Sequence, residues 1–119
     1  MSTRCTIHFC YGSMEETEAI IYRHCDGYPE AMLPDLDRFF SDVENQTKDT
    51  RFSDPSYLAA KFVVWQSREN IEAYEGYEMH VGGPLDFLGL GICMEDPGDI
   101  EYRYHVVCMD NNRPRVHWE

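Results

Sequence analysis

Long apolar runs are missing from this sequence. No window of about 18 consecutive apolar residues occurs, which is the approximate minimum for a helix that crosses a membrane. The first five residues, Met-Ser-Thr-Arg-Cys, also lack the apolar segment of a secretory signal. We therefore expect a cytoplasmic protein with no membrane partner.

Positive charge is scarce. Ten Lys and Arg residues stand against 22 Asp and Glu residues, which gives a formal net charge of −12. This charge repels nucleic acids and attracts proteins with a basic surface. We therefore expect a protein partner that is basic, and no direct binding to nucleic acid.

The charge is also uneven, because no Lys or Arg occurs between residues 69 and 102. One interpretation of this stretch is a solvated loop and sheet rim. The other is an acidic docking surface for a basic protein. The residues proposed for that surface are Glu72, Glu75, Glu78, Glu95, Asp96 and Asp99.

The spacings typical of catalytic and metal-binding residues are absent as well. The five cysteines are odd in number and include no C-x-x-C pair, so they are expected to be reduced and mostly buried on strands. The five histidines include no H-x-x-x-H or H-E-x-x-H pair, and no calcium loop or phosphate-binding glycine loop is present. The sequence therefore predicts no cofactor and no metal, and it favours a protein that is not an enzyme.

One alternative keeps a metal site open. Strand alternation places His8, His105 and His117 on the same side of the expected sheet. If their strands are neighbours, three imidazoles could bind zinc or copper. The other interpretation is that they are ordinary exposed histidines on a polar face.

The apolar content is sufficient for one core. Hydrophobic residues make up 43% of the 119 residues, and aromatic residues 13%. In the first expected strand Cys5, Ile7 and Phe9 share one face, which predicts a strand with one buried side and one side toward solvent. Alternating patterns predict strands at residues 3–10, 17–25, 87–94, 100–109 and 115–118.

Two amphipathic helices are expected between the second and third strands. Pro29 or Pro34 begins the first helix, which ends near Gln46. Its apolar stripe consists of Leu33, Leu36, Phe39, Phe40 and Val43. Pro55 begins the second helix, with Ser53 or Asp54 as its cap, and the stripe of that helix consists of Leu58, Phe62 and Trp65.

The second helix is expected to end at about Asn70, and the glycine-rich residues 72–86 that follow predict a loop. The order is therefore two strands, two helices and three strands. It indicates a single α+β domain over residues 1–119, with an antiparallel or mixed sheet and both helices packed on one face.

The segment from Tyr22 to Glu30 is the most distinctive part of the chain, because it joins a strand to a helix and concentrates ionisable side chains. These side chains could form a binding cluster. The alternative is a turn at Asp26-Gly27 followed by a helix start at Pro29. The candidate binding residues are Arg23, His24, Asp26, Tyr28 and Glu30.

The motif Y-R-H-C-D-G-Y-P-E at residues 22–30 resembles a segment shared by small hypothetical proteins of bacteria and their phages. The matching pattern continues in L-P-D-L at 33–36, Y-L-A-A at 57–60 and G-D-I-E-Y-R-Y at 98–104. The resemblance implies an accessory or host-interaction protein associated with phage, and it carries over no functional residues.

Together these features favour a protein-binding or accessory module without enzymatic activity, acting on a host or defence protein. One version is a DNA mimic that occupies a basic groove of its partner. A small enzyme or ligand binder is the alternative if the candidate residues between Tyr22 and Glu30 converge on a deep pocket. A metal-binding accessory protein is the third interpretation.

Overall fold

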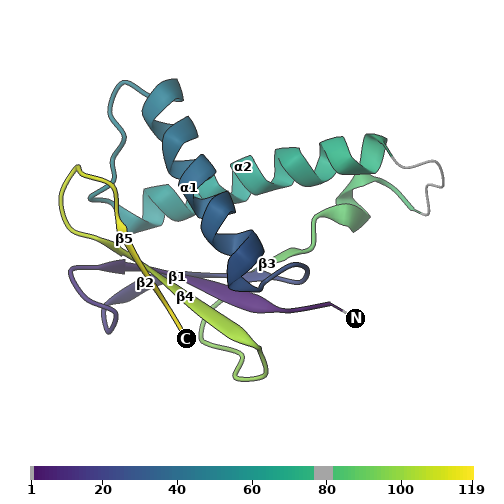
Figure 1. Cartoon of the computed structure of the whole chain (residues 1–119), viewed down its shortest axis with the longest axis horizontal. Coiled ribbons are helices and arrows are strands. Elements are labelled where there is room, and N and C mark those ends of the chain that lie inside the picture. The colour runs from purple at the N-terminus through teal and green to yellow at the C-terminus, as the bar shows by residue number, and fades with distance from the viewer. Residues whose placement is uncertain (1, 77–81) are drawn as a thin grey trace.

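Five strands form one mixed sheet, and two helices cover one of its faces (Figure 1). This computed structural model describes residues 2–76 and 82–119. The predicted α+β class and the order of strands and helices are confirmed. The elements are β1 (Cys5–Tyr11), β2 (Thr17–Arg23), α1 (Pro29–Gln46), α2 (Pro55–Glu75), the 3₁₀ turn η1 (Pro84–Phe87), β3 (Leu90–Cys93), β4 (Tyr102–Cys108) and β5 (Arg115–Trp118).

The strands lie in the order β3-β2-β1-β4-β5. β1 runs antiparallel to β2 and parallel to β4, and the outer pairs β2–β3 and β4–β5 are antiparallel. β1 is therefore central, while β3 and β5 form the two edges. The parallel β1–β4 pair decides between the two sheet types that the sequence left open.

The helix-covered face of the sheet holds the core. Ile7 of β1 pairs with Ile21 of β2 and Tyr104 of β4, so these three side chains point toward the helices. Both predicted stripes pack against them, as expected. Their buried members are Met32, Leu36, Phe39, Phe40 and Val43 of α1 and Leu58, Ala59 and Phe62 of α2.

One member of the first predicted stripe is wrong. Leu33 is 36% exposed, and Met32 is buried in its place. Residues 32, 36, 39 and 43 follow the spacing of one helix face, and Leu33 lies just beside that face. None of the helices within the described ranges is long and apolar enough to cross a membrane.

The opposite face of the sheet is also largely buried, contrary to the expectation of one buried side. Thr6 and Cys10 have no exposed surface, and His8 has 6%. The segment 94–101, which connects β3 to β4, lies below the sheet in Figure 1 and brings Asp96 Oδ2 to 3.5 Å from His8 Nε2. Alternation along a strand identifies two faces, but it does not indicate what covers the second one.

The second helix begins as predicted and ends later. Pro55 is its first residue, and Asp54 precedes it, but the Asp54 carboxylate bonds Arg51 instead of a helix amide. The helix continues to Glu75 because its last turns pack on η1, where the Tyr74 ring lies 4.8 Å from the Phe87 ring. Residues 72–75 are therefore helical and not loop, and residues 77–81 lie outside the described residues.

Candidate functional site

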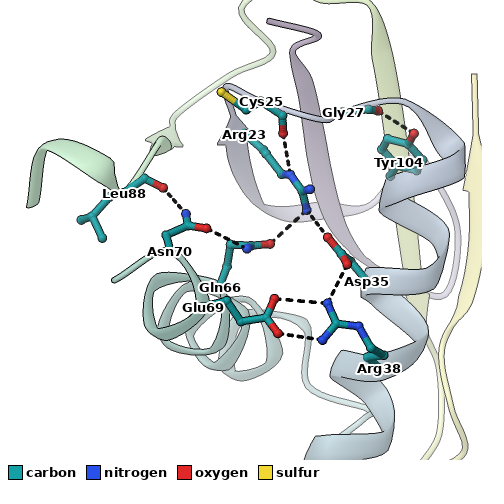
Figure 2. Close-up of polar contacts among 10 residues, drawn as sticks. All are labelled: Arg23, Cys25, Gly27, Asp35, Arg38, Gln66, Glu69, Asn70, Leu88 and Tyr104. Atoms are coloured by element: carbon teal, nitrogen blue, oxygen red, sulfur yellow. Dashed lines mark hydrogen bonds and ion pairs between the residues drawn. The ribbon is translucent and has the colours of Figure 1, made fainter. Parts of the chain in front are cut away.

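Arg23, the first of the candidate binding residues, is buried beneath the helices (Figure 2). It stands at the end of β2 on the helix-covered face, with 8% of its surface exposed. Nη1 donates to Asp35 Oδ2 of α1 at 2.8 Å and to Gln66 Oε1 of α2 at 3.0 Å, and Nε donates to the Cys25 carbonyl at 2.8 Å. One guanidinium thus joins the sheet to both helices, and Asp35 compensates its charge.

The same polar network extends to the outer side of the helix pair (Figure 2). Arg38 of α1 donates to Asp35 Oδ1 at 2.7 Å and to both carboxylate oxygens of Glu69 on α2, at 2.7 and 3.2 Å. The hydrogen bonds that Arg38 donates to Glu69 and Asp35 hold the pKa of Arg38 above its ordinary range. Asn70 of α2 donates to the Leu88 carbonyl ahead of β3, so the network also connects α2 to the segment that leads into the edge strand.

The other four candidate binding residues are exposed and do not converge with Arg23. His24 Nδ1 lies 2.7 Å from the Tyr22 hydroxyl, and Asp26 occupies the turn with φ of +57°. Tyr28 is the residue before α1, and Glu30 lies on its exposed first turn. None of the five candidates lines the groove between α1 and α2 or the smaller groove between α1 and β5, which is lined by Leu36, Arg113 and Val116 among others. The geometry thus favours a turn and a helix start over a ligand pocket in this segment.

The acidic residues proposed as one docking surface lie in separate places. Figure 1 shows the end of α2 above the sheet and the segment 94–101 below it. Glu78 lies outside the described residues. The upper group is Glu72 and Glu75, and the lower group is Glu95, Asp96 and Asp99.

Two carboxylates of the lower group are already paired. Asp96 accepts hydrogen bonds from Arg103 Nε at 2.5 Å and Nη2 at 3.2 Å, and Arg103 lowers the pKa of Asp96. Asp99 Oδ1 lies 3.4 Å from Arg4 Nη2. Charge available to a partner therefore remains mainly on Glu72, Glu75 and Glu95.

Two of the three aligned histidines form a buried pair. The three histidines do lie on neighbouring strands, because His105 of β4 pairs with His8 of β1 and with His117 of β5. The His8 and His105 ring centroids are 4.9 Å apart, and both rings are buried, so the description as exposed histidines is wrong for these two. His8 Nε2 lies 3.0 Å from Thr6 Oγ1, whereas both ring nitrogens of His105 are buried without a hydrogen bond.

These histidines do not form a metal centre in the structure. Within residues 2–76 and 82–119, no three His, Cys, Asp or Glu side chains are grouped closely enough to hold an ion. His117 is exposed at the sheet edge, and His105 Nε2 is 3.9 Å from Glu119 Oε1. The arrangement is a pair of imidazoles in contact, tilted by 34° to each other, with carboxylates at its margin.

We expect the free energy of unfolding to fall as the pH is lowered from about 7.5 to about 5.5. Burial, followed by repulsion from His105, lowers the pKa of His8 below its ordinary value of 6.5, although Asp96 and Glu119 act in the opposite direction. The unfolded chain therefore binds this proton more readily than the folded protein does, and stability is lost as the pH falls through the folded pKa. Urea unfolding at both pH values measures the effect.

The matched control for this prediction is the exposed histidine of the same row. His8→Asn should flatten the pH dependence between about pH 7.5 and pH 5.5. His117→Asn should retain the fall seen in the unaltered protein. An equal fall in the unaltered protein and in His8→Asn would contradict the assignment to His8.

The cysteines do not supply a nucleophile in the described residues. All five are free thiols. Burial raises the pKa of Cys5 and of Cys108 to about 12, so both are neutral in the folded core. Cys25 is exposed, and Nδ1 of the adjacent His24 ring lies 2.7 Å from the Tyr22 hydroxyl.

One surface feature was not predicted from the sequence: an apolar edge of the sheet at β3. Ile92 is 80% exposed, Met94 99% and Leu85 76%. The predicted strand 87–94 is shorter than expected and spans only Leu90–Cys93. The absence of charge from 87 to 94 was visible in the sequence, but the edge position depends on the order of the strands.

Comparison with known proteins adds no relative. No protein-family model matches the chain, and no curated protein or solved structure is significantly similar to it. The resemblance of residues 22–30 to phage and bacterial proteins stays a prediction.

Proposed function

We propose that this protein binds a partner protein by accepting an extended, positively charged segment along the free edge of β3. The observation that carries the proposal is an uncharged, apolar edge strand in the most acidic part of the chain. Residues 69–102 contain nine Asp and Glu and no Lys or Arg. Edge strands present unpaired backbone groups, and extended peptides add to them as a further strand.

The backbone of β3 offers the hydrogen bonds for such an addition. The His24 amide donates to the Gly89 carbonyl at 2.9 Å. In an antiparallel pair, residues whose backbone groups face the neighbouring strand alternate with residues whose groups face away, so this bond shows which residues of β3 bond to β2. The backbone groups of Gly91 then face β2, and those of Leu90 and Ile92 face away from the sheet. An added strand can bond to these outward groups without displacing any pairing already present.

Two devices that commonly protect an edge, charged side chains and proline, are missing from β3, which has four residues. Edge strands are commonly blocked by Lys, Pro or other charged side chains, yet β3 reads Leu-Gly-Ile-Cys. The opposite edge, β5, carries Arg115. Self-pairing through β3 is opposed by the net charge of −12 on every copy, so the exposed edge favours a segment of opposite charge.

Acidic residues occur on the elements that precede and follow β3 in the chain. Glu72 and Glu75 lie in the last turns of α2, which packs on η1, and Glu95 lies two residues after the end of β3. Within the described residues none of these three carboxylates is held in an ion pair, so each is available to a Lys or Arg of the partner. Charge would steer the basic segment to the edge, and Ile92 with Met94 would supply apolar contact.

A single proline substitution tests this proposal. Ile92→Pro removes an outward amide and leaves the β2 pairing intact, because proline is tolerated where the amide faces solvent. The probe is a short peptide that alternates lysine and valine, and its binding is followed by fluorescence anisotropy. We expect the variant to bind it at least about tenfold more weakly, and salt to weaken binding to the unaltered protein.

Two controls make the outcome decisive. Trp118→Pro places the same change on the β5 edge and should leave binding unchanged, and a peptide alternating glutamate and valine should not bind. Equal binding of both peptides, or undiminished binding to Ile92→Pro, would overturn the proposal. A dimer in sedimentation experiments that Ile92→Pro abolishes would assign the edge to a second copy instead.

A further inference from the structure

A groove between the two helices, on the side away from the sheet, is a second candidate binding site. Its volume is about 350 Å³. α1 and α2 cross above the sheet in Figure 1, and the groove lies between the second half of α1 and the middle of α2. Its apolar lining consists of Phe39 and Val43 of α1 and Ala60, Val64 and Trp65 of α2.

The floor of the groove is held rigidly in place. Trp65 Nε1 donates to Asp42 Oδ2 at 2.7 Å, and the Arg38 guanidinium lies 5.1 Å from the centre of the Trp65 ring. The Phe39 ring lies 5.6 Å from the Trp65 ring. Since Val64 remains 59% exposed beside these rings, the groove presents apolar surface that the protein itself does not cover.

The groove contains basic side chains that are in no ion pair with a described residue, whereas most basic side chains of the protein are paired. Six of the ten basic residues hold carboxylates in ion pairs: Arg4, Arg23, Arg38, Arg51, Arg103 and Arg113. The other four, Lys48, Lys61, Arg68 and Arg115, are in no ion pair with any described residue. Two of those four, Lys61 and Arg68, line the groove.

These two cations belong to one face of α2. Lys61 and Arg68 are two helical turns apart, with Val64 between them along the groove. Lys61 Nζ donates to the Thr50 carbonyl at 3.0 Å, which positions the ammonium group without neutralising it. Asp42, the acidic residue of the lining, is already bonded to Trp65.

We propose that this groove binds a small organic anion with an apolar body, such as an aromatic or acyl carboxylate or sulfonate. The body would lie against Trp65, Phe39 and Val64, and the anionic group would reach Lys61 or Arg68. The volume is at the lower end of the range of small-molecule sites, which is about 300–1,000 Å³ and mostly apolar with a few charged groups. In a protein with 22 acidic residues, unpaired cations on an apolar groove favour a negatively charged ligand. This site is separate from the β3 edge and does not depend on the function proposed for it.

The experiment compares an anionic and a neutral probe of the same shape. 8-Anilinonaphthalene-1-sulfonate carries the charge, and N-phenyl-1-naphthylamine has the same rings without it. In a Trp118→Phe background Trp65 is the sole tryptophan, so its fluorescence reports occupation of the groove directly. We expect saturable quenching of Trp65 by the sulfonate and weaker binding of the neutral amine.

Paired charge variants identify the cations involved. Lys61→Met with Arg68→Met removes both charges but keeps much of the apolar stems, and it should weaken sulfonate binding about tenfold, with little change for the amine. Lys48→Met with Arg115→Met removes the same charge elsewhere and should leave both probes unchanged. Val64→Glu should abolish binding of both, and Ile92→Pro should affect neither.

Three results would overturn the inference. These are equal loss of sulfonate binding in the two double variants, equal affinity for the two probes, or no saturable quenching of Trp65. A groove that fails to bind the sulfonate but takes up an acidic amphipathic peptide would be a protein-docking site instead. Urea unfolding of each variant confirms that its fold is retained before the probes are compared.

Discussion

Replacement of Phe62 with alanine is expected to lower the free energy of unfolding by about 3–5 kcal/mol. Phe62 of α2 has no exposed surface. Its ring meets Phe39 of α1 edge-on at 5.3 Å and lies 6.0 Å from Phe9 of β1, so it connects both helices to the central strand. The substitution removes these contacts and leaves a cavity that packed neighbours can fill only partly.

The expected loss is a large part of the stability of a domain this size, which is typically about 5–15 kcal/mol. Urea or guanidinium unfolding gives the value, and an unchanged slope with denaturant would show that the denatured state is not altered. Phe62→Leu restores much of the volume and should cost less than about 1.5 kcal/mol.

The control for Phe62 is an exposed aromatic residue of the same helix. Tyr57 is 51% exposed, and the Arg51 guanidinium lies 3.6 Å from the centre of its ring. Tyr57→Ala removes a comparable ring from the surface and should cost at most about 1 kcal/mol. Similar losses for Phe62→Ala and Tyr57→Ala would contradict the placement of Phe62 at the centre of the core.

Replacement of Asp35 with asparagine is the second large expected effect, a loss of about 3 kcal/mol. The two side chains of the Arg23–Asp35 pair are 10% and 18% exposed, at a separation of 2.8 Å. Asparagine keeps the shape and one oxygen acceptor, but the buried Arg23 charge is left without a counter-charge. Gln66 and the Cys25 carbonyl still accept from it, and neither can neutralise it.

A double variant separates the charge effect from a general loss of packing. Arg23→Met in the Asp35→Asn background removes the uncompensated charge and should recover part of the lost stability. Asp37→Asn is the surface control, because Asp37 is 73% exposed in its pair with Arg113 and should contribute less than about 1 kcal/mol. If the double variant loses as much free energy of unfolding as the two single variants added together, Arg23 and Asp35 are not coupled as an ion pair.

The polar network also bears on both proposed sites. Arg38 links Asp35 to Glu69 and lies over Trp65, so it helps to fix the helix pair that forms the groove. Asn70 holds the Leu88 carbonyl ahead of β3, and Leu90 then begins the edge strand. The segment expected to recognise a ligand thus contributes, through Arg23, to the rigidity of sites formed elsewhere.

Local patterns in the sequence determined the elements and most of their inward faces. The two-residue spacing of Ile7 and Phe9 on a strand, and the helical spacing of Leu36 and Phe39, correctly identified residues of the core. Pro55 correctly marked the start of the second helix, and the first helix begins at Pro29, one of the two starts that the sequence left open. These signals are readable because a strand and a helix repeat at fixed intervals, whatever surrounds them.

The same reasoning could not place the candidate sites. Arg23 lies two residues after Ile21 on the same strand and therefore shares its core face. Its burial, however, depends on Asp35 and Gln66, which lie 12 and 43 residues away in the sequence. Glu72 and Asp96 belong to one acidic stretch of the sequence, but Glu72 lies on α2 over the helix-covered face, whereas Asp96 lies beside His8 on the opposite face.

By itself, the sequence determined the order of strands and helices, the two apolar helix faces and the excess of negative charge, all of which depend on neighbours within a few turns or residues. Only the tertiary structure shows that β3 is an exposed edge, that the His8 and His105 rings are in contact, and that Lys61 and Arg68 line an apolar groove. Each of these depends on which distant segments pair and pack, and that choice is made by the whole set of long-range contacts.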